Sequence, residues 1–147
     1  MANYDITVIA GDGIGPEVTR EAIRSVEAAA SLDEATFQWT SYPWGSEYYF
    51  EHGRMAPGDF LDTLAGHDAI LLGAVGFPGV PDHMSLWGLL IPIRREFQQY
   101  VALRPVRLFE GMKSPLAGRK PGDIEFLIVR ENNEGEYSEI GGRLYEG

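Results

Sequence analysis

The sequence has 147 residues, of which 44% are apolar and 23% charged, and these are ordinary values for one globular domain. Its formal net charge of −10 lies entirely in residues 1–93, which hold 13 acidic residues and three arginines, whereas residues 94–147 hold nine acidic and nine basic residues. This acidity excludes nucleic acid as a partner, and no apolar run approaches the roughly 20 residues that span a bilayer. The absence of cysteine excludes disulfides and predicts a cytoplasmic protein.

The first predicted elements are a buried strand over residues 4–10, a glycine turn over residues 11–15 and a helix that continues to residue 30. Pro16 and Glu17 suit the first turn of that helix. Together the three elements predict the opening of a βαβ unit. The turn lacks the last glycine of a dinucleotide fingerprint, because Pro16 stands there. Both an anion-accepting helix N-terminus and a tight structural turn therefore remain open.

The chain continues with a predicted strand over residues 36–42, short helices over residues 45–52 and 57–65, and a buried strand of parallel type over residues 68–74. That last strand runs into a loop of small residues that extends to residue 83. Open α/β sheets bind ligands at the carboxyl ends of their strands. Small residues there let a ligand approach the backbone, so the loop is a predicted ligand site.

Residues 85–104 combine an apolar patch with arginines. Residues 86–93 are apolar, a short helix begins with Arg94 and Arg95, and Arg104 precedes a proline. Guanidinium groups bind carboxylates two oxygens at a time. The pattern therefore favours a small acid with a short carbon skeleton, and solvated surface arginines are the alternative.

The clearest strand covers residues 123–130 and ends in Arg130. Four consecutive apolar residues predict that it is buried, and Tyr137 follows seven residues later. A tyrosine is protonated at neutral pH and can give a proton to an enolate, whereas an ordinary surface tyrosine is the alternative. The Pro/Gly-rich segment of residues 111–122 is expected to cross between two lobes.

Four motifs together resemble the β-decarboxylating dehydrogenases, the family of isopropylmalate, isocitrate, homoisocitrate and tartrate/D-malate dehydrogenases. They are residues 11–18, 72–76, 103–105, and 127–132 with Tyr137. The resemblance covers the whole chain as the N-terminal part of a longer family member. It implies an α/β fold, an isopropylmalate dehydrogenase-like open sheet with helices on both faces, incomplete in this chain. It places residues 1–103 in a first domain and residues 104–147 at the start of a second, central or dimerisation domain.

The resemblance also implies an activity, its cofactors and a homodimer. The family oxidises a 2R-hydroxy acid with NAD or NADP and then removes the β-carboxylate, while Mg²⁺ or Mn²⁺ polarises the ketone. The catalytic lysine, the metal ligands and the adenosine-binding segment are expected beyond residue 147, so no metal ligand is expected in this chain. Arg94, Arg104 and Arg130 correspond to arginines that bind the substrate carboxylates, and Tyr137 to the tyrosine that protonates the enol. The residues that correspond to a loop near the nicotinamide are Gly73, Ala74, Val75 and Gly76.

Three short segments are similar to the tartrate/D-malate branch of the family, namely residues 81–83, 85–88 and 94–97. Trp87 stands where isopropylmalate enzymes tend to have an acidic residue, and its ring would shrink the pocket for a four-carbon acid unless it faces away. Leu90, in the same apolar patch, is also expected to contact the substrate. The expected reaction is NAD-dependent oxidative decarboxylation of D-malate or tartrate. A 3-isopropylmalate dehydrogenase, a non-catalytic dicarboxylate-binding module and an inactive truncated product are the alternatives.

Overall fold

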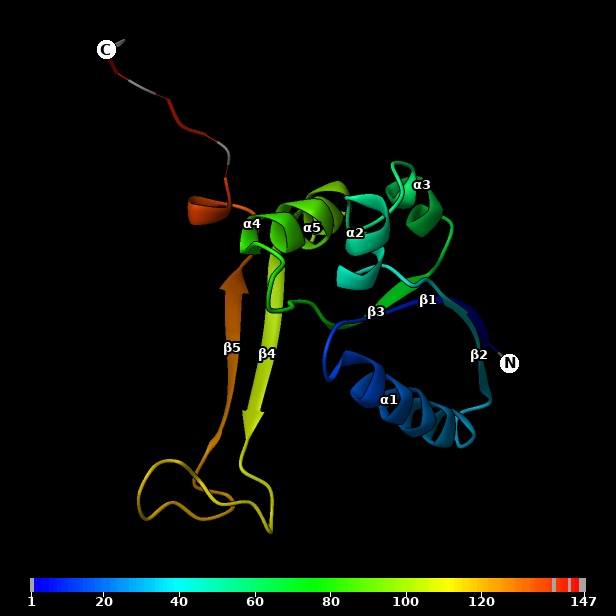
Figure 1. Ribbon diagram of the computed structural model, residues 1–147. Helices are drawn as coiled ribbons and strands as arrows, with labels where there is room; N and C mark the ends of the chain where they lie inside the picture. Colours follow the sequence, from blue (N-terminus) through cyan, green and yellow to red (C-terminus); the bar gives the residue numbers. More distant parts are fainter. Residues whose placement is uncertain (1, 139, 143, 146–147) are drawn as a thin grey trace. The chain divides into compact units, whose positions relative to one another are not determined.

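Figure 1 shows a computed structural model of the chain, which describes residues 2–138, 140–142 and 144–145. The chain divides into two compact units, Met1–Ile93 and Arg94–Gly147, and each is described by itself. This division falls where the charge balance of the sequence changes. The domain boundary that the sequence places between residues 103 and 104 stays a prediction.

The first unit is built on a three-stranded parallel sheet of order β2-β1-β3, formed by β1 (Ala2–Gly11), β2 (Ala35–Ser41) and β3 (Ala69–Ala74). The central strand β1 buries Ile6, Val8 and Ile9, which are between 0% and 8% exposed. Helix α1 (Gly15–Ala30) lies on one face of the sheet, and α2 (Ser46–His52) and α3 (Phe60–Ala65) lie on the other (Figure 1). The predicted α/β sheet with helices on both faces is therefore confirmed.

A continuous helical segment closes the first unit and enters the second. It consists of α4 (Asp82–Ser85), a π-helical turn (Leu86–Leu90) and α5 (Ile91–Glu96). The predicted loop after β3 is therefore shorter than expected and ends at Pro81. Asp82 follows this proline, and its acidic side chain in the first turn suits the positive end of a helix. None of the helices in the described part of the chain is long and apolar enough to span a membrane.

The second unit is an antiparallel ribbon of β4 (Val101–Arg107) and β5 (Glu125–Glu131). The Pro/Gly-rich segment between them joins the two strands, so the prediction that it crosses between two lobes is wrong. A 3₁₀ turn, Gly135–Tyr137, follows β5.

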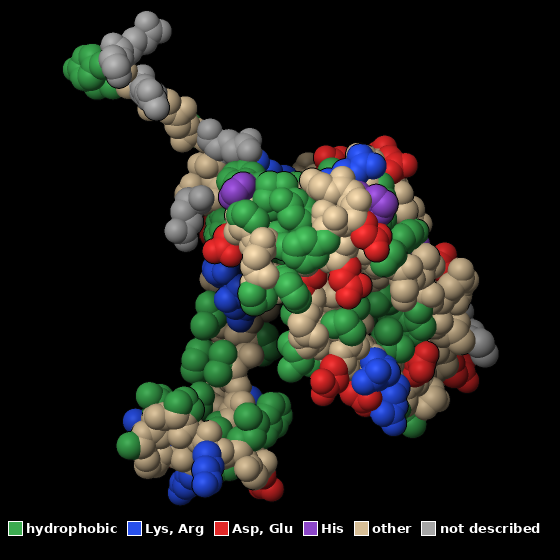
Figure 2. Space-filling model, in the orientation of Figure 1, with side chains coloured by type: hydrophobic (Ala, Val, Ile, Leu, Met, Phe, Trp, Pro, Cys, Tyr) green, Lys and Arg blue, Asp and Glu red, His purple; other side chains and the backbone are tan. Residues whose placement is uncertain are grey.

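The expected burial of the strand over residues 123–130 is also not found. Its four apolar residues are between 44% and 65% exposed, since a two-stranded ribbon contains no second layer to cover its faces. Figure 2 shows apolar side chains on the surface of the ribbon and of its connecting loop. The apolar residues of β5 are Phe126, Leu127, Ile128 and Val129.

Glycines allow β1, β3 and α1 to approach closely. A Cβ atom at Gly11 would overlap the carbonyl oxygen of Ala74, and one at Gly15 or Gly73 would overlap that of Ala10. The glycine turn of residues 11–15 therefore serves backbone packing, as the tight structural turn predicts, and the anion-accepting helix N-terminus stays a prediction.

Gly11 and Gly13 provide a matched test of this packing, because both have a positive φ, 72° and 57°, but only Gly11 is crowded. Gly13→Ala should lower the free energy of unfolding by about 1 kcal/mol through backbone strain alone. Gly11→Ala should lower it by about 3 kcal/mol or more, because overlap adds to strain. Urea unfolding of the full-length protein, followed by circular dichroism, measures both. Equal losses would show that the close approach of β1 and β3 does not require Gly11.

Candidate functional site

The carboxylate of Asp12 joins three loops at the carboxyl end of the parallel sheet. Asp12 is 7% exposed. Its Oδ1 accepts a hydrogen bond from the backbone N–H of Ser46 at 2.7 Å, and its Oδ2 accepts from the Ser46 hydroxyl at 2.7 Å and from the backbone N–H of Gly76 at 2.8 Å. The backbone N–H of Asp12 also donates to the carbonyl of Ala74 at 2.6 Å. One buried acid thus fixes the segment that follows β3.

This network lies where the strand order reverses. The chain leaves β1 for β2 on one side and returns to β3 on the other side, and open α/β sheets bind ligands at such a switch point. Gly73 and Ala74 end strand β3, and Val75 and Gly76 lie just beyond it. A Cβ atom at Gly76 would meet no heavy atom within 4 Å. The open space at Gly76 fits the close approach of a flat ligand such as a nicotinamide ring.

Arg94, Arg130 and Tyr137 come together in the second unit. The guanidinium carbon of Arg130 lies 5.1 Å from the centre of the Tyr137 ring, and that of Arg94 lies 6.0 Å from it. Both distances allow a cation–π interaction. Arg94 comes from α5, Arg130 from β5 and Tyr137 from the 3₁₀ turn that follows.

Arg104 adds a third positive charge to this group. The strand register pairs Ala102 with Arg130 and Arg104 with Ile128. Arg104 and Arg130 are therefore diagonal neighbours on one face of the ribbon. We call Arg94, Arg104, Arg130 and Tyr137 the arginine cluster.

The electrostatics of the arginine cluster favour an anion. Burial lowers the pKa of Arg94, and the positive charges of Arg130 and Arg104 lower it further, while Tyr137 acts in the opposite direction. Arginine side chains cannot be deprotonated in proteins, so the cluster is positively charged. Within the part of the chain that the structure describes, no carboxylate forms an ion pair with any of the three. The cluster can therefore bind a carboxylate without first breaking an internal ion pair.

The turn that carries Tyr137 is held from two sides. A guanidinium nitrogen of Arg95 donates a hydrogen bond to the carbonyl of Tyr137. The carboxylate of Glu131 accepts from the backbone N–H groups of Asn133 at 2.7 Å and Glu134 at 2.8 Å. These bonds, that of Asn133 first, hold the pKa of Glu131 below its ordinary value. Tyr137 is thus presented on a turn with defined anchors.

The other predicted substrate residues belong to the first unit. Trp87 and Leu90 lie in the π-helical turn, where Trp87 is 39% exposed and Leu90 is half-buried. Gly88 between them packs against the buried side chain of Met55. The structure therefore brings together Arg94, Arg104, Arg130 and Tyr137, while Trp87, Leu90 and the predicted nicotinamide loop belong to the first unit.

No group of three or more His, Cys, Asp or Glu side chains within residues 2–138, 140–142 and 144–145 is arranged to hold a metal ion. The expectation that the metal ligands lie beyond residue 147 stays a prediction.

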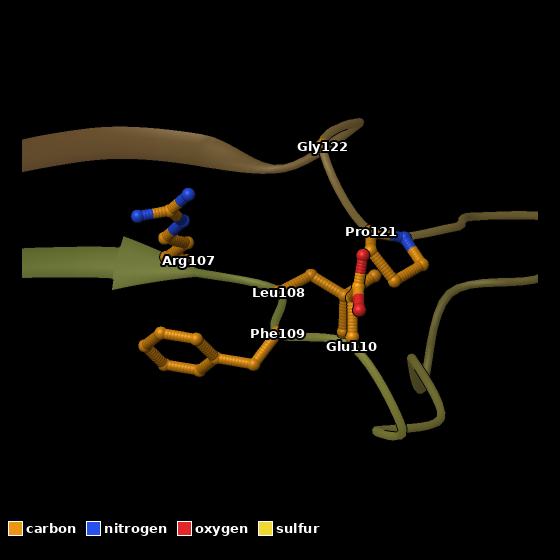
Figure 3. A pocket seen from close by; sticks show the side chains of 6 residues that line it. All are labelled: Arg107, Leu108, Phe109, Glu110, Pro121 and Gly122. Carbon is orange, nitrogen blue, oxygen red and sulfur yellow. The ribbon is translucent and has the colours of Figure 1, made fainter.

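A hollow of about 560 Å³ lies at the end of the ribbon opposite to Arg130 (Figure 3). Its walls carry one guanidinium group, from Arg107, which lies 5.8 Å from the ring of Phe109. Glu110 places a carboxylate on the same wall. This opposite charge makes the hollow a poor site for a dicarboxylate in comparison with the arginine cluster. The lining residues are Arg107, Leu108, Phe109, Glu110, Pro121 and Gly122.

Sequence reasoning missed three residues that position this machinery. Asp12 stands inside a recognised motif, but its partners are 34 and 64 residues away, so no local pattern reveals its role. Asn132 and Arg95 are adjacent in sequence to Glu131 and Arg94. Only that adjacency to other site residues could have drawn attention to them.

The role of Asp12 leads to a second prediction. Asp12→Ala should lower the free energy of unfolding by about 3 kcal/mol or more, because buried N–H groups of Ser46 and Gly76 lose a charged acceptor. The matched control is Asp68→Ala, since exposed Asp68 accepts a single hydrogen bond, from the backbone of Asp5 at 2.8 Å. That loss should be about 1 kcal/mol or less. Urea unfolding of the full-length protein measures both values, and similar losses would contradict the central role of Asp12.

Comparison with known proteins agrees with the motifs and the fold. The model of the isocitrate/isopropylmalate dehydrogenase family matches residues 5–145. D-malate dehydrogenase (decarboxylating) of Escherichia coli (strain K12) is 55% identical over 149 aligned positions, which cover 100% of this chain and 41% of that protein. Tartrate dehydrogenase/decarboxylase of Pseudomonas putida is 52% identical over 146 positions, covering 98% of this chain and 40% of that protein.

Solved structures show the same relationship. Isocitrate dehydrogenase from Methylococcus capsulatus has a TM-score of 0.73 at 28% identity, covering 93% of this chain and 37% of that one. The apo form of a β-decarboxylating dehydrogenase from Thermococcus kodakarensis has a TM-score of 0.61 at 31% identity, covering 90% and 35%. The chain spans about two fifths of the length of the curated relatives named above. The resemblance indicated by the four motifs is confirmed, and the chain belongs to the isocitrate/isopropylmalate dehydrogenase family.

Proposed function

We propose that this chain is part of an NAD-dependent enzyme that oxidises and decarboxylates a small 2R-hydroxy dicarboxylic acid, D-malate or tartrate. The observation that carries the proposal is the arginine cluster, in which Arg94 and Arg130 lie against the Tyr137 ring and, among the described residues, none of the three arginines forms an ion pair with a carboxylate. Relatives named for D-malate and for tartrate support the substrate class. The activity would belong to a longer, cytoplasmic and homodimeric protein.

In this proposal Arg94, Arg104 and Arg130 bind the carboxylates of the substrate and fix its orientation. Bidentate contacts from planar guanidinium groups suit this task, because they fix direction as well as charge. Arg94 is half-buried, and a partly desolvated charge attracts a carboxylate more strongly than an exposed one. The arginines therefore determine which end of the acid faces the reacting groups.

Tyr137 would give a proton to the carbon that loses CO₂. Its ring lies against two guanidinium groups, and its backbone carbonyl is held by Arg95, so both ring and turn are positioned. When bound, NAD accepts a hydride from the substrate and Mn²⁺ or Mg²⁺ withdraws electrons from the resulting ketone. The residues proposed to meet the nicotinamide end of NAD are Gly73, Ala74, Val75 and Gly76.

Trp87 and Leu90 are proposed to form the apolar wall that limits the size of the substrate. A large indole ring leaves less room for a branched side chain, which favours a four-carbon acid over 3-isopropylmalate. The apolar character of the π-helical turn supports this assignment.

The proposal is tested by assaying the full-length protein with NAD and Mn²⁺ against D-malate, tartrate and 3-isopropylmalate. NADH formation and CO₂ release with D-malate or tartrate are the expected results, because the arginine cluster matches a dicarboxylate and Trp87 restricts its size. Turnover of 3-isopropylmalate alone would overturn the substrate assignment. Failure to bind any of the three acids in calorimetry would overturn the proposed function as a whole.

Tyr137→Phe tests the role of the phenol while it keeps the ring that Arg94 and Arg130 contact. We expect kcat for D-malate to fall by about a hundredfold or more, since positioned acids typically contribute that much. KM for D-malate should change little, because the arginines remain. Tyr100→Phe is the control, since Tyr100 is 63% exposed in the same unit. An unchanged kcat in Tyr137→Phe would exclude Tyr137 as the proton donor.

A further inference from the structure

Asn132 occupies a buried position directly beside the arginine cluster. It is 6% exposed and follows the end of β5. Its side-chain Nδ2 donates to the carbonyl of Gln99 at 3.0 Å, and its backbone N–H donates to the carbonyl of Tyr100 at 3.0 Å. Its Oδ1 accepts a hydrogen bond from Nη2 of Arg130 at 2.8 Å. Asn132 therefore connects Arg130 to the turn that joins α5 to β4.

The two side-chain bonds fix the orientation of the amide. A backbone carbonyl can only accept, so the NH₂ group must face Gln99, and the oxygen must then face Arg130. A carboxylate has no donor and could not satisfy the carbonyl of Gln99 in its ionised form. A hydrocarbon side chain would satisfy neither partner. Among side chains of similar size and shape, only a neutral amide can both donate to the carbonyl of Gln99 and accept from Arg130.

Arg130 keeps its positive charge despite this contact, because the amide oxygen that it meets is neutral. One face of its guanidinium group lies against the Tyr137 ring at 5.1 Å. Its Nε is enclosed and has no hydrogen-bond partner among the residues that the structure describes, so this atom is not presented to a ligand. The attraction for a substrate carboxylate therefore comes from the charge of the group.

We propose that Asn132 is a positioning residue that holds Arg130 through a neutral acceptor, and thereby leaves its positive charge for a carboxylate of the substrate. The inference rests on the proposed function, because the ligand is the dicarboxylate named there. An aspartate at this position would form an ion pair with Arg130 and compete with the substrate. The choice of amide over acid at residue 132 thus determines affinity for the dicarboxylate.

The test compares Asn132→Asp with Asn132→Ala in the full-length protein, using calorimetric titration with D-malate. Both variants lose the donor to Gln99, but only the aspartate pairs with Arg130. Asn132→Asp should therefore bind D-malate at least about tenfold more weakly than Asn132→Ala, as expected for competition by a charge-assisted bond. NAD affinity and the thermal unfolding midpoint are measured for each variant, to identify any general loss of structure.

Gln98→Glu is the matched control, because it makes the same amide-to-acid change on an exposed side chain of the same unit. Its affinity for D-malate should stay within about twofold of the unsubstituted protein, since an exposed charge is screened by solvent and salt. If Gln98→Glu weakens binding as much as Asn132→Asp, the effect is one of general charge and the inference fails. Equal affinities of Asn132→Asp and Asn132→Ala would also overturn it.

If Asn132→Asp does not fold, Asn132→Ser replaces it, because a hydroxyl keeps a neutral acceptor. It should bind D-malate more tightly than Asn132→Ala, and equal binding would overturn the inference. If D-malate does not bind to the unsubstituted protein, the titrations are repeated with tartrate and 3-isopropylmalate. Binding without the expected order of variants refutes the role of Asn132 alone, whereas no binding of any acid refutes the proposed function together with it.

Discussion

One buried carboxylate holds together the end of the sheet at which the nicotinamide is proposed to bind. Asp12 takes hydrogen bonds from two backbone N–H groups and a hydroxyl, and in doing so it connects the turn after β1 to the start of α2 and to the segment after β3. In dinucleotide-binding folds, N–H groups of this kind often face the phosphate of a ligand. Here the chain supplies the negative charge itself, which leaves the open side of Gly76 for an uncharged part of a ligand and not for a phosphate.

The second unit shows the opposite arrangement, in which three positive charges gather and none of them forms an ion pair with a carboxylate of the described residues. Three guanidinium groups lie close enough to influence one another, and arginine side chains donate hydrogen bonds to neutral acceptors beside them. The amide oxygen of Asn132 and the carbonyl of Tyr137 accept these bonds without neutralising a charge that is proposed to bind the substrate. A site that binds an anionic substrate must hold its arginines in place with neutral acceptors, since an internal acid would reduce the attraction for the substrate.

The sequence predicted the elements whose residues show a local pattern, and it failed where the determining contacts are remote. Runs of β-branched residues and the glycines that end them predicted β1, α1, β2 and β3. The motifs around Arg130 predicted the arginine cluster. The burial of β5 was predicted wrongly. Four consecutive apolar residues indicate a strand that packs against another layer, but they do not show whether its own unit contains that layer. The π-helical turn and the start of α4 at Asp82 depend on packing, such as that of Gly88 on Met55, which no spacing rule describes. Asp12 acts through partners 34 and 64 residues away, and Asn132 joins neighbouring Arg130 to Gln99, 33 residues away, so only the fold reveals these roles.

The ribbon of β4 and β5 also has a consequence for the colloidal behaviour of this polypeptide. Its apolar side chains are exposed, and its outer strand edges are unpaired among the residues that the structure describes, which is a template for edge-to-edge association. Residues 94–147 have no net charge to oppose such association, whereas residues 1–93 carry all of the −10. Mutual repulsion between copies of the chain therefore comes from the acidic first unit alone. A preparation of the second unit by itself would lose that protection and precipitate at concentrations that the longer chain tolerates.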